Sequence, residues 1–108
     1  MNFDMNKMLQ EAQRMQEELA KAQEEAASEV VEASAGGGMV TVKANGAGEV
    51  LSITIDARAI DPDDPELLAD LVLAAVNEAL RSSRALMESK MSGLMPGGLG
   101  DLGGLLPG

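Results

Sequence analysis

The spacing of apolar residues changes twice along this chain of 108 residues, and each change marks a different kind of secondary structure. From residue 3 to 27 apolar side chains recur at alternating intervals of three and four, which is typical of an amphipathic helix. From 29 to 56 the period falls to two, as in half-buried strands. Helical spacing returns from 61 to 92. The pattern predicts an α+β domain with the element order α-β-β-β-α.

The first predicted helix carries a thin apolar stripe. Three of its members are Met and three are Ala, so it buries little surface and adapts to its neighbours. We expect it to pack on something larger than one partner helix. The stripe consists of Met5, Met8, Ala12, Met15, Leu19, Ala22 and Ala26.

The middle segment predicts a small antiparallel sheet of three strands, with one covered face and one polar face. The first strand lies around 29–33, and residues 39–44 and 50–56 alternate clearly. Asn45-Gly46 between the last two predicts a hairpin, because both residues tolerate a positive φ. Gly36-Gly37-Gly38 is interpreted as a flexible connection.

The second predicted helix has a clear start. Asp64 is placed as the N-cap, Pro65 at the first helical position and Glu66 in the first turn, and the helix is expected to end near Ser92-Gly93. Both predicted helices are longer than the strands and should overhang the sheet. We expect both to lie on one face of the sheet. Such a protomer is marginal alone, so a homodimer with projecting helical arms is predicted.

Residues 1–92 are therefore expected to form one domain, and 93–108 a flexible tail rich in Gly, Leu and Pro with Asp101 as its charged residue. Leucine pairs in this tail are suited to docking weakly on a groove. The tail also contains a G-x-G-x-x-G match, but it follows no strand and opens no helix, so it indicates no nucleotide site.

Composition excludes several classes of function. The chain has no Cys, His, Trp or Tyr and one Phe, so thiolate and imidazole catalysis, Cys-based zinc sites and base stacking on aromatic residues are excluded. We predict no enzyme activity, no cofactor and no metal. No apolar run reaches the ~20 residues of a membrane span, so the expected location is the cytoplasm. The acidic group at 61–66 is interpreted as helix capping, with a calcium or magnesium site as the weaker alternative.

Basic residues form the most informative pattern. Lys7, Arg14 and Lys21 recur every seven residues and make one stripe along the first helix, here called the basic stripe. It is suited to following a phosphate backbone. From the residues alone, however, local ion pairing on a solvated face is the favoured interpretation, because each of the three has a Glu four positions on, at Glu11, Glu18 and Glu25. Arg81 and Arg84 form a second pair, in the more polar half of the second helix.

Four segments of this sequence resemble the YbaB/EbfC family of bacterial nucleoid-associated proteins. They are 7–17 (KMLQEAQRMQE), 35–40 (AGGGMV), 45–56 with NGAGEV and ITID, and 71–79 (LVLAAVNEA). The resemblance covers residues 3 to about 95. It implies a tweezer-like homodimer that binds double-stranded DNA in the nucleoid and takes part in chromosome organisation and gene expression. It also implies DNA contacts from the projecting helices, here at Lys7, Arg14, Lys21, Arg81 and Arg84.

Net charge departs from the basic surface that DNA binders usually carry. At −10, the chain repels phosphate everywhere except at local basic positions, so binding should be weak and salt-sensitive. The alternative function is an acidic adaptor that partners DNA-handling proteins without binding DNA strongly itself.

Overall fold

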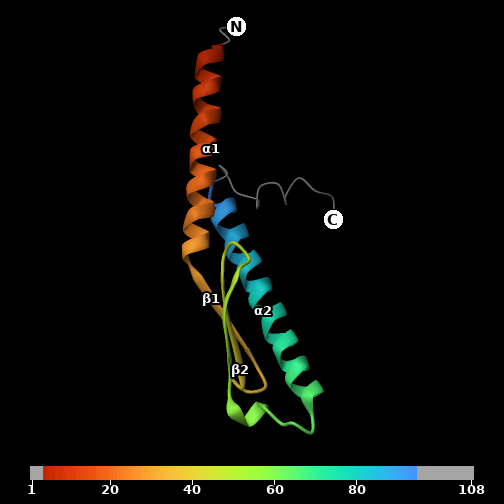
Figure 1. Cartoon of the computed structure of the whole chain (residues 1–108). Coiled ribbons are helices and arrows are strands. Elements are labelled where there is room, and N and C mark those ends of the chain that lie inside the picture. Colours follow the sequence, from red (N-terminus) through yellow and green to blue (C-terminus); the bar gives the residue numbers. More distant parts are fainter. Residues whose placement is uncertain (1–3, 95–108) are drawn as a thin grey trace, which may run out of the picture.

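The computed structural model describes residues 4–94. It consists of α1 (Met5–Ser28), β1 (Val30–Ala35), β2 (Val40–Asn45), β3 (Val50–Ile55), the 3-10 turn η1 (Ala57–Ala59) and α2 (Pro65–Ser92) (Figure 1). The predicted order of helices and strands is confirmed, whereas η1 was not predicted. Residues 95–108 of the predicted tail lie outside the described part, and the division at residue 92 stays a prediction.

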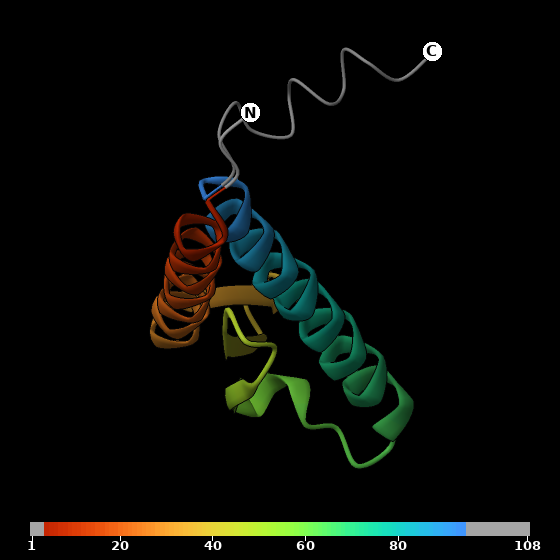
Figure 2. The ribbon, with the colours of Figure 1, turned by 90° about the horizontal axis from the view of Figure 1, so that it is seen from above.

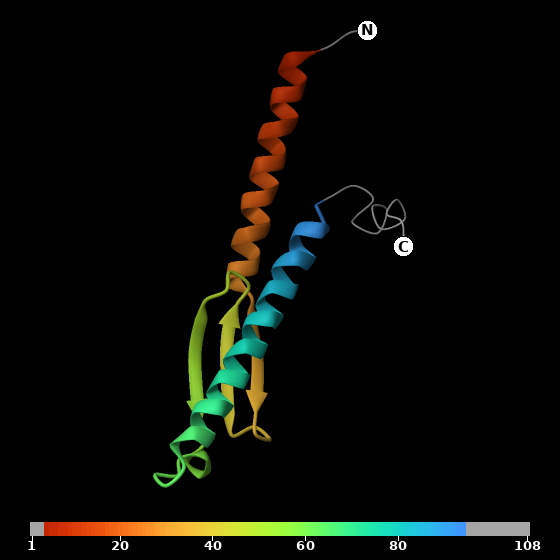
Figure 3. The same cartoon turned by 90° about the vertical axis from the view of Figure 1, so that its right-hand side faces the viewer.

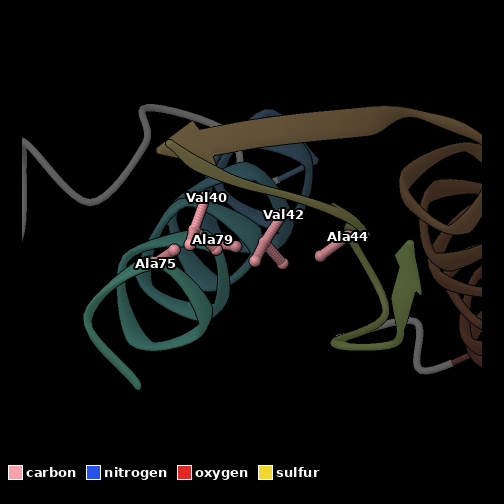
Figure 4. Close-up of a cluster of buried hydrophobic side chains, with 5 residues drawn as sticks. All are labelled: Val40, Val42, Ala44, Ala75 and Ala79. Carbon is pink, nitrogen blue, oxygen red and sulfur yellow. The ribbon is translucent and has the colours of Figure 1, made fainter. Parts of the chain in front are cut away.

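The sheet has the order β1-β2-β3 with both pairs antiparallel, so β2 is central. Val40 pairs with Ile55 and Val42 with Ile53, which places these side chains on one face. Helix α2 packs against that face over β1 and β2. The core consists of valines and an alanine from β2 against small residues of α2, which allow the helix to approach closely: Val40, Val42, Ala44, Ala75 and Ala79 (Figure 4).

Only α2 covers the sheet, so the expectation that both helices lie on one face is wrong. Helix α1 ends at Ser28, and a single extended residue, Glu29, separates it from β1. One extended residue cannot reverse the chain, so α1 lies beyond the end of the sheet and projects past α2 (Figure 3). Its buried residues are Ala22 and Ala26, and every described residue before Ala22 is exposed. Seen from above, α2 crosses the sheet obliquely while α1 is viewed almost end-on (Figure 2).

Strand β3 also differs from prediction, because its inner face is not covered. All six residues of β3 are exposed, including Leu51 at 52%, Ile53 at 45% and Ile55 at 37%. The reason is geometric: α2 crosses β1 and β2 and leaves the β3 edge of the sheet beside it. One protomer therefore presents an apolar strip along a sheet edge.

The turn between β2 and β3 joins both helices to the sheet. The Gly46 N–H donates to the Ala26 carbonyl at 2.8 Å, and a Cβ added at Gly46 would lie 2.5 Å from that oxygen. The buried Ser83 hydroxyl of α2 donates to the Asn45 carbonyl at 2.6 Å. These contacts anchor the base of α1.

The hairpin is confirmed, but its predicted backbone conformation is wrong. Neither Asn45 nor Gly46 has a positive φ, and the left-handed residue is Gly48 at +84°. Asn45 acts through its side chain, since its Oδ1 accepts the N–H groups of Ala47 and Glu49. The segment 36–38, interpreted as a flexible connection, is a tight turn in which all three glycines have a positive φ.

Candidate nucleic-acid interface

The basic stripe lies on the projecting helix α1. Lys7, Arg14 and Lys21 are all exposed. With a rise of 1.5 Å and a turn of 100° per residue, they stand ~10 Å apart, span ~21 Å and point ~100° away from the side of α1 that buries Ala22 and Ala26. Lys7 and Arg14 border one shallow surface hollow of about 250 Å³, together with Gln10 and Glu11. The predicted common face is therefore present, and it is directed to solvent.

No ion pair occupies the basic stripe within residues 4–94. The salt bridges of this part of the chain join Arg58 to Asp56, Arg81 to Glu78 and Lys90 to Glu29. The ion pairing that the residues alone favour, between Lys7, Arg14 and Lys21 and the glutamates four positions on, is therefore wrong for this part of the chain. Those glutamates nevertheless flank the stripe, so its positive potential is local and modest.

Arg81 and Arg84 form a separate surface. Both are exposed and lie beside Ser83, whose hydrogen bond to Asn45 places this part of α2 level with the end of β2. At 100° per residue, Arg81 points ~160° and Arg84 ~100° away from the buried Ser83 side. Arg81 also donates to Glu78 through Nε at 3.0 Å and Nη2 at 2.6 Å. The two arginines therefore lie level with the end of the sheet, and the expectation that they sit on a projecting helical arm is wrong.

Two other basic residues have structural partners. The Lys90 ammonium meets the Glu29 carboxylate at 2.5 Å and ties α2 to the junction between α1 and β1; this hydrogen bond raises the pKa of Lys90. The Arg58 guanidinium donates two hydrogen bonds to the Asp56 carboxylate, from Nε to Oδ1 and from Nη2 to Oδ2. These bonds hold the pKa of the Asp56 carboxyl below its ordinary value. Sequence could not identify the Lys90 pair, because its partner is 61 positions away.

The acidic group at 61–66 forms turn and cap hydrogen bonds. The Asp61 carboxylate accepts the Asp63 N–H at 2.9 Å, and Asp64, the predicted N-cap, accepts the Leu67 N–H at 3.2 Å. Within residues 4–94, no three acidic side chains are arranged to hold a metal ion. No helix in the same part of the chain is long and apolar enough to cross a membrane.

Comparisons with known proteins agree with one another. Residues 1–99 match the model of the YbaB/EbfC DNA-binding family. A nucleoid-associated protein of Thermoanaerobacter pseudethanolicus is 50% identical over 95 residues, covering 88% of this chain and 86% of the relative. One from Saccharopolyspora erythraea is 48% identical over 109 residues, covering 97% and 93%.

Among solved structures, the chain is similar to an uncharacterized protein from Helicobacter pylori, with a TM-score of 0.69 and 24% identity. The match covers 78% of this chain and 88% of that one. At this identity the likeness concerns the fold alone.

Proposed function

This chain belongs to the YbaB/EbfC DNA-binding family, and on that premise we propose that it binds double-stranded DNA as a homodimer in the bacterial nucleoid. Its roles there are chromosome organisation and the regulation of gene expression. The observation that carries the proposal is the basic stripe, three exposed cations along a projecting helix that make no ion pair among the described residues. Membership of a DNA-binding family also agrees with the prediction that the chain is not an enzyme.

The exposed face of β3 supports the homodimer. A strand at a sheet edge that exposes Leu51, Ile53 and Ile55 invites pairing or aggregation unless something covers it. A second copy covers it most simply, because two identical strips bury each other around a two-fold axis. Dimerisation through β3 leaves α1 of each copy free to project. The dimer then presents two basic stripes to one DNA duplex.

The basic stripe suits phosphate contacts and not base readout. Its ~10 Å spacing equals about three base-pair rises of ~3.4 Å, so each cation reaches a different part of the backbone. Arg81 and Arg84 add contacts only where the duplex passes beside the sheet. Six stripe contacts per dimer give a slope of log K against log salt of ~−5 and a ~1000-fold loss of affinity between 50 and 200 mM salt.

A charge-matched pair of variants tests the proposal. Lys7→Gln, Arg14→Gln and Lys21→Gln together remove three positive charges from the stripe. A control variant, Lys43→Gln, Arg58→Gln and Lys90→Gln, removes three others; because Lys90 also pairs with Glu29 beside α1, the control's helical circular dichroism signal and thermal unfolding must first match those of the stripe variant. We expect the stripe variant alone to lose DNA binding at low salt and to flatten the salt slope by ~0.9 per lost contact. Equal loss in both variants would show that only net charge matters and would contradict the proposed interface.

The net charge of −10 favours a second candidate, an acidic adaptor for DNA-handling proteins. Such a protein binds basic partners directly and DNA only through them. Capture of partners from a lysate with and without nuclease distinguishes the two. Partners retained after nuclease treatment, combined with no DNA binding by the purified protein at low salt, would replace the first candidate by the second.

A further inference from the structure

An apolar hollow of about 360 Å³ lies between α1 and the C-terminal end of α2. Its apolar walls are Met15 and Leu19 of α1, Met91 of α2 and Leu94 just after α2. Four polar residues complete the lining, but the surface they expose there is mostly that of their carbon atoms: Gln16, Glu18, Glu88 and Ser92. Met15 is 59% exposed and Leu19 38% exposed. The volume lies within the ~300–1,000 Å³ range of ligand pockets. These exposed side chains belong to the stripe that was predicted to need a larger partner.

We propose that the chain's own C-terminal segment, residues 95–108, docks its leucines into this hollow. The described chain ends at Leu94, which is itself a wall of the hollow, so the segment begins at the site. Its 14 residues reach up to ~46 Å when extended, at ~3.3 Å per residue. Even Leu99, five residues on from Leu94, can reach ~17 Å from it.

The composition of the segment fits the hollow. It contains four leucines and a single charged side chain, that of Asp101. Glu18 and Glu88 lie at the hollow, so an occupant with little negative charge is favoured. Direct attachment gives the segment an effective concentration in the millimolar range, so that docking with a dissociation constant of ~1 mM already fills about half of the sites.

The hollow is separate from the proposed dimer surface. Strand β3 lies in the sheet, whereas the hollow lies beyond the end of the sheet, where α2 comes up beside α1 (Figure 1). Docking there has a mechanical consequence for α1. The helix is otherwise buried only at Ala22 and Ala26, and a docked segment would brace it against α2 further along. Docking of the segment does not require DNA.

A nitroxide label on the full chain tests the proposal. Because the chain has no Cys, Gly104→Cys gives one attachment point, and the methionine methyl groups report its position by NMR. We expect strong broadening of the Met15 methyl signal; Met91 lies close in sequence to the start of the segment and is broadened with or without docking. Broadening should be weaker at Met5, which lies ~15 Å further along α1. No broadening at Met15, or equal broadening at all methionines, overturns the proposal.

Two further samples identify the occupant. Broadening at Met15 should fall strongly when the four leucines are replaced, but it should persist with Asp101→Asn. In a mixture of labelled and isotope-bearing copies, broadening between copies would show that the partner's segment fills the hollow and would overturn docking within one chain. A Met15 methyl signal that shifts with protein concentration, but not when the tail leucines are replaced, would show that a second copy covers the hollow. That result would also overturn docking within one chain. The leucine substitutions are Leu99→Ser, Leu102→Ser, Leu105→Ser and Leu106→Ser.

Discussion

Gly46→Ala is predicted to release α1 from the sheet. Gly46 lies outside the positive-φ region, so an alanine meets no backbone strain there. Its Cβ would instead lie 2.5 Å from the Ala26 oxygen and 2.9 Å from the Ala26 carbonyl carbon, where real contacts stay above 3.0 Å. The backbone segments of the turn and of α1 must therefore separate by about 0.5 Å or more. The hydrogen bond from Gly46 to Ala26 weakens with that separation.

The magnitude follows from these two effects. Overpacking lowers the free energy of unfolding by ~1–3 kcal/mol, and a lost hydrogen bond lowers it by ~0.5–1.5 kcal/mol. In the opposite direction, alanine reduces the conformational entropy of the unfolded chain, which raises the free energy of unfolding by ~0.4–1 kcal/mol. The free energy of unfolding should fall by ~2 kcal/mol, which lowers Tm by ~8–16 °C for a domain of this size. Urea unfolding followed by circular dichroism measures it, because the chain has no Trp or Tyr to report by fluorescence.

Gly37→Ala is the matched control. Gly37 has a φ of +67°, and a Cβ added there would meet nothing within 4 Å, so alanine costs only backbone strain of ~1–2 kcal/mol. Hydrogen exchange should rise at the α1 amides around Ala26 in Gly46→Ala and not in Gly37→Ala. A Gly46→Ala protein within ~0.5 kcal/mol of wild type, or one with unchanged exchange in α1, would refute the close-approach argument.

Three other predictions concern packing, assembly and pH. Ser83→Ala should lower the free energy of unfolding by ~1 kcal/mol, measured by urea titration, because a buried hydrogen bond to backbone is lost. Ile53→Asp should leave the helical circular dichroism signal intact and shift sedimentation towards monomer, since this side chain is 45% exposed in one protomer; unchanged sedimentation would exclude β3 from the interface. Arg58→Ala should return the pKa of Asp56 towards 3.8 in an NMR titration of carboxyl signals. Because the folded-state pKa is lowered, this pair adds stability above pH ~4 that is lost as the pH falls further, and the variant should lose that contribution.

Local sequence was sufficient to predict the elements and most of their ends. Apolar residues at intervals of three and four indicated the helices, and apolar residues at every second position indicated the strands. Both patterns arise because side chains on one face of an element are buried together. Asp64, Pro65 and Glu66 act where they were placed, since capping is a local interaction between residues close in sequence. The common face of Lys7, Arg14 and Lys21 also follows from helix geometry alone.

Relations between elements depended instead on packing in three dimensions. The position of α2 over β1 and β2 leaves β3 uncovered, and no local pattern distinguishes a covered strand from an exposed one with the same alternation. The roles of Asn45 and Gly46 depend on Ser83 and Ala26, which come from two different helices. Ion pairing likewise depends on contacts between segments far apart in the sequence. Lys90 pairs with Glu29, whereas the residues of the basic stripe make no ion pair among the described residues. Local spacing specifies which residues share a face, whereas packing between distant segments specifies what that face meets.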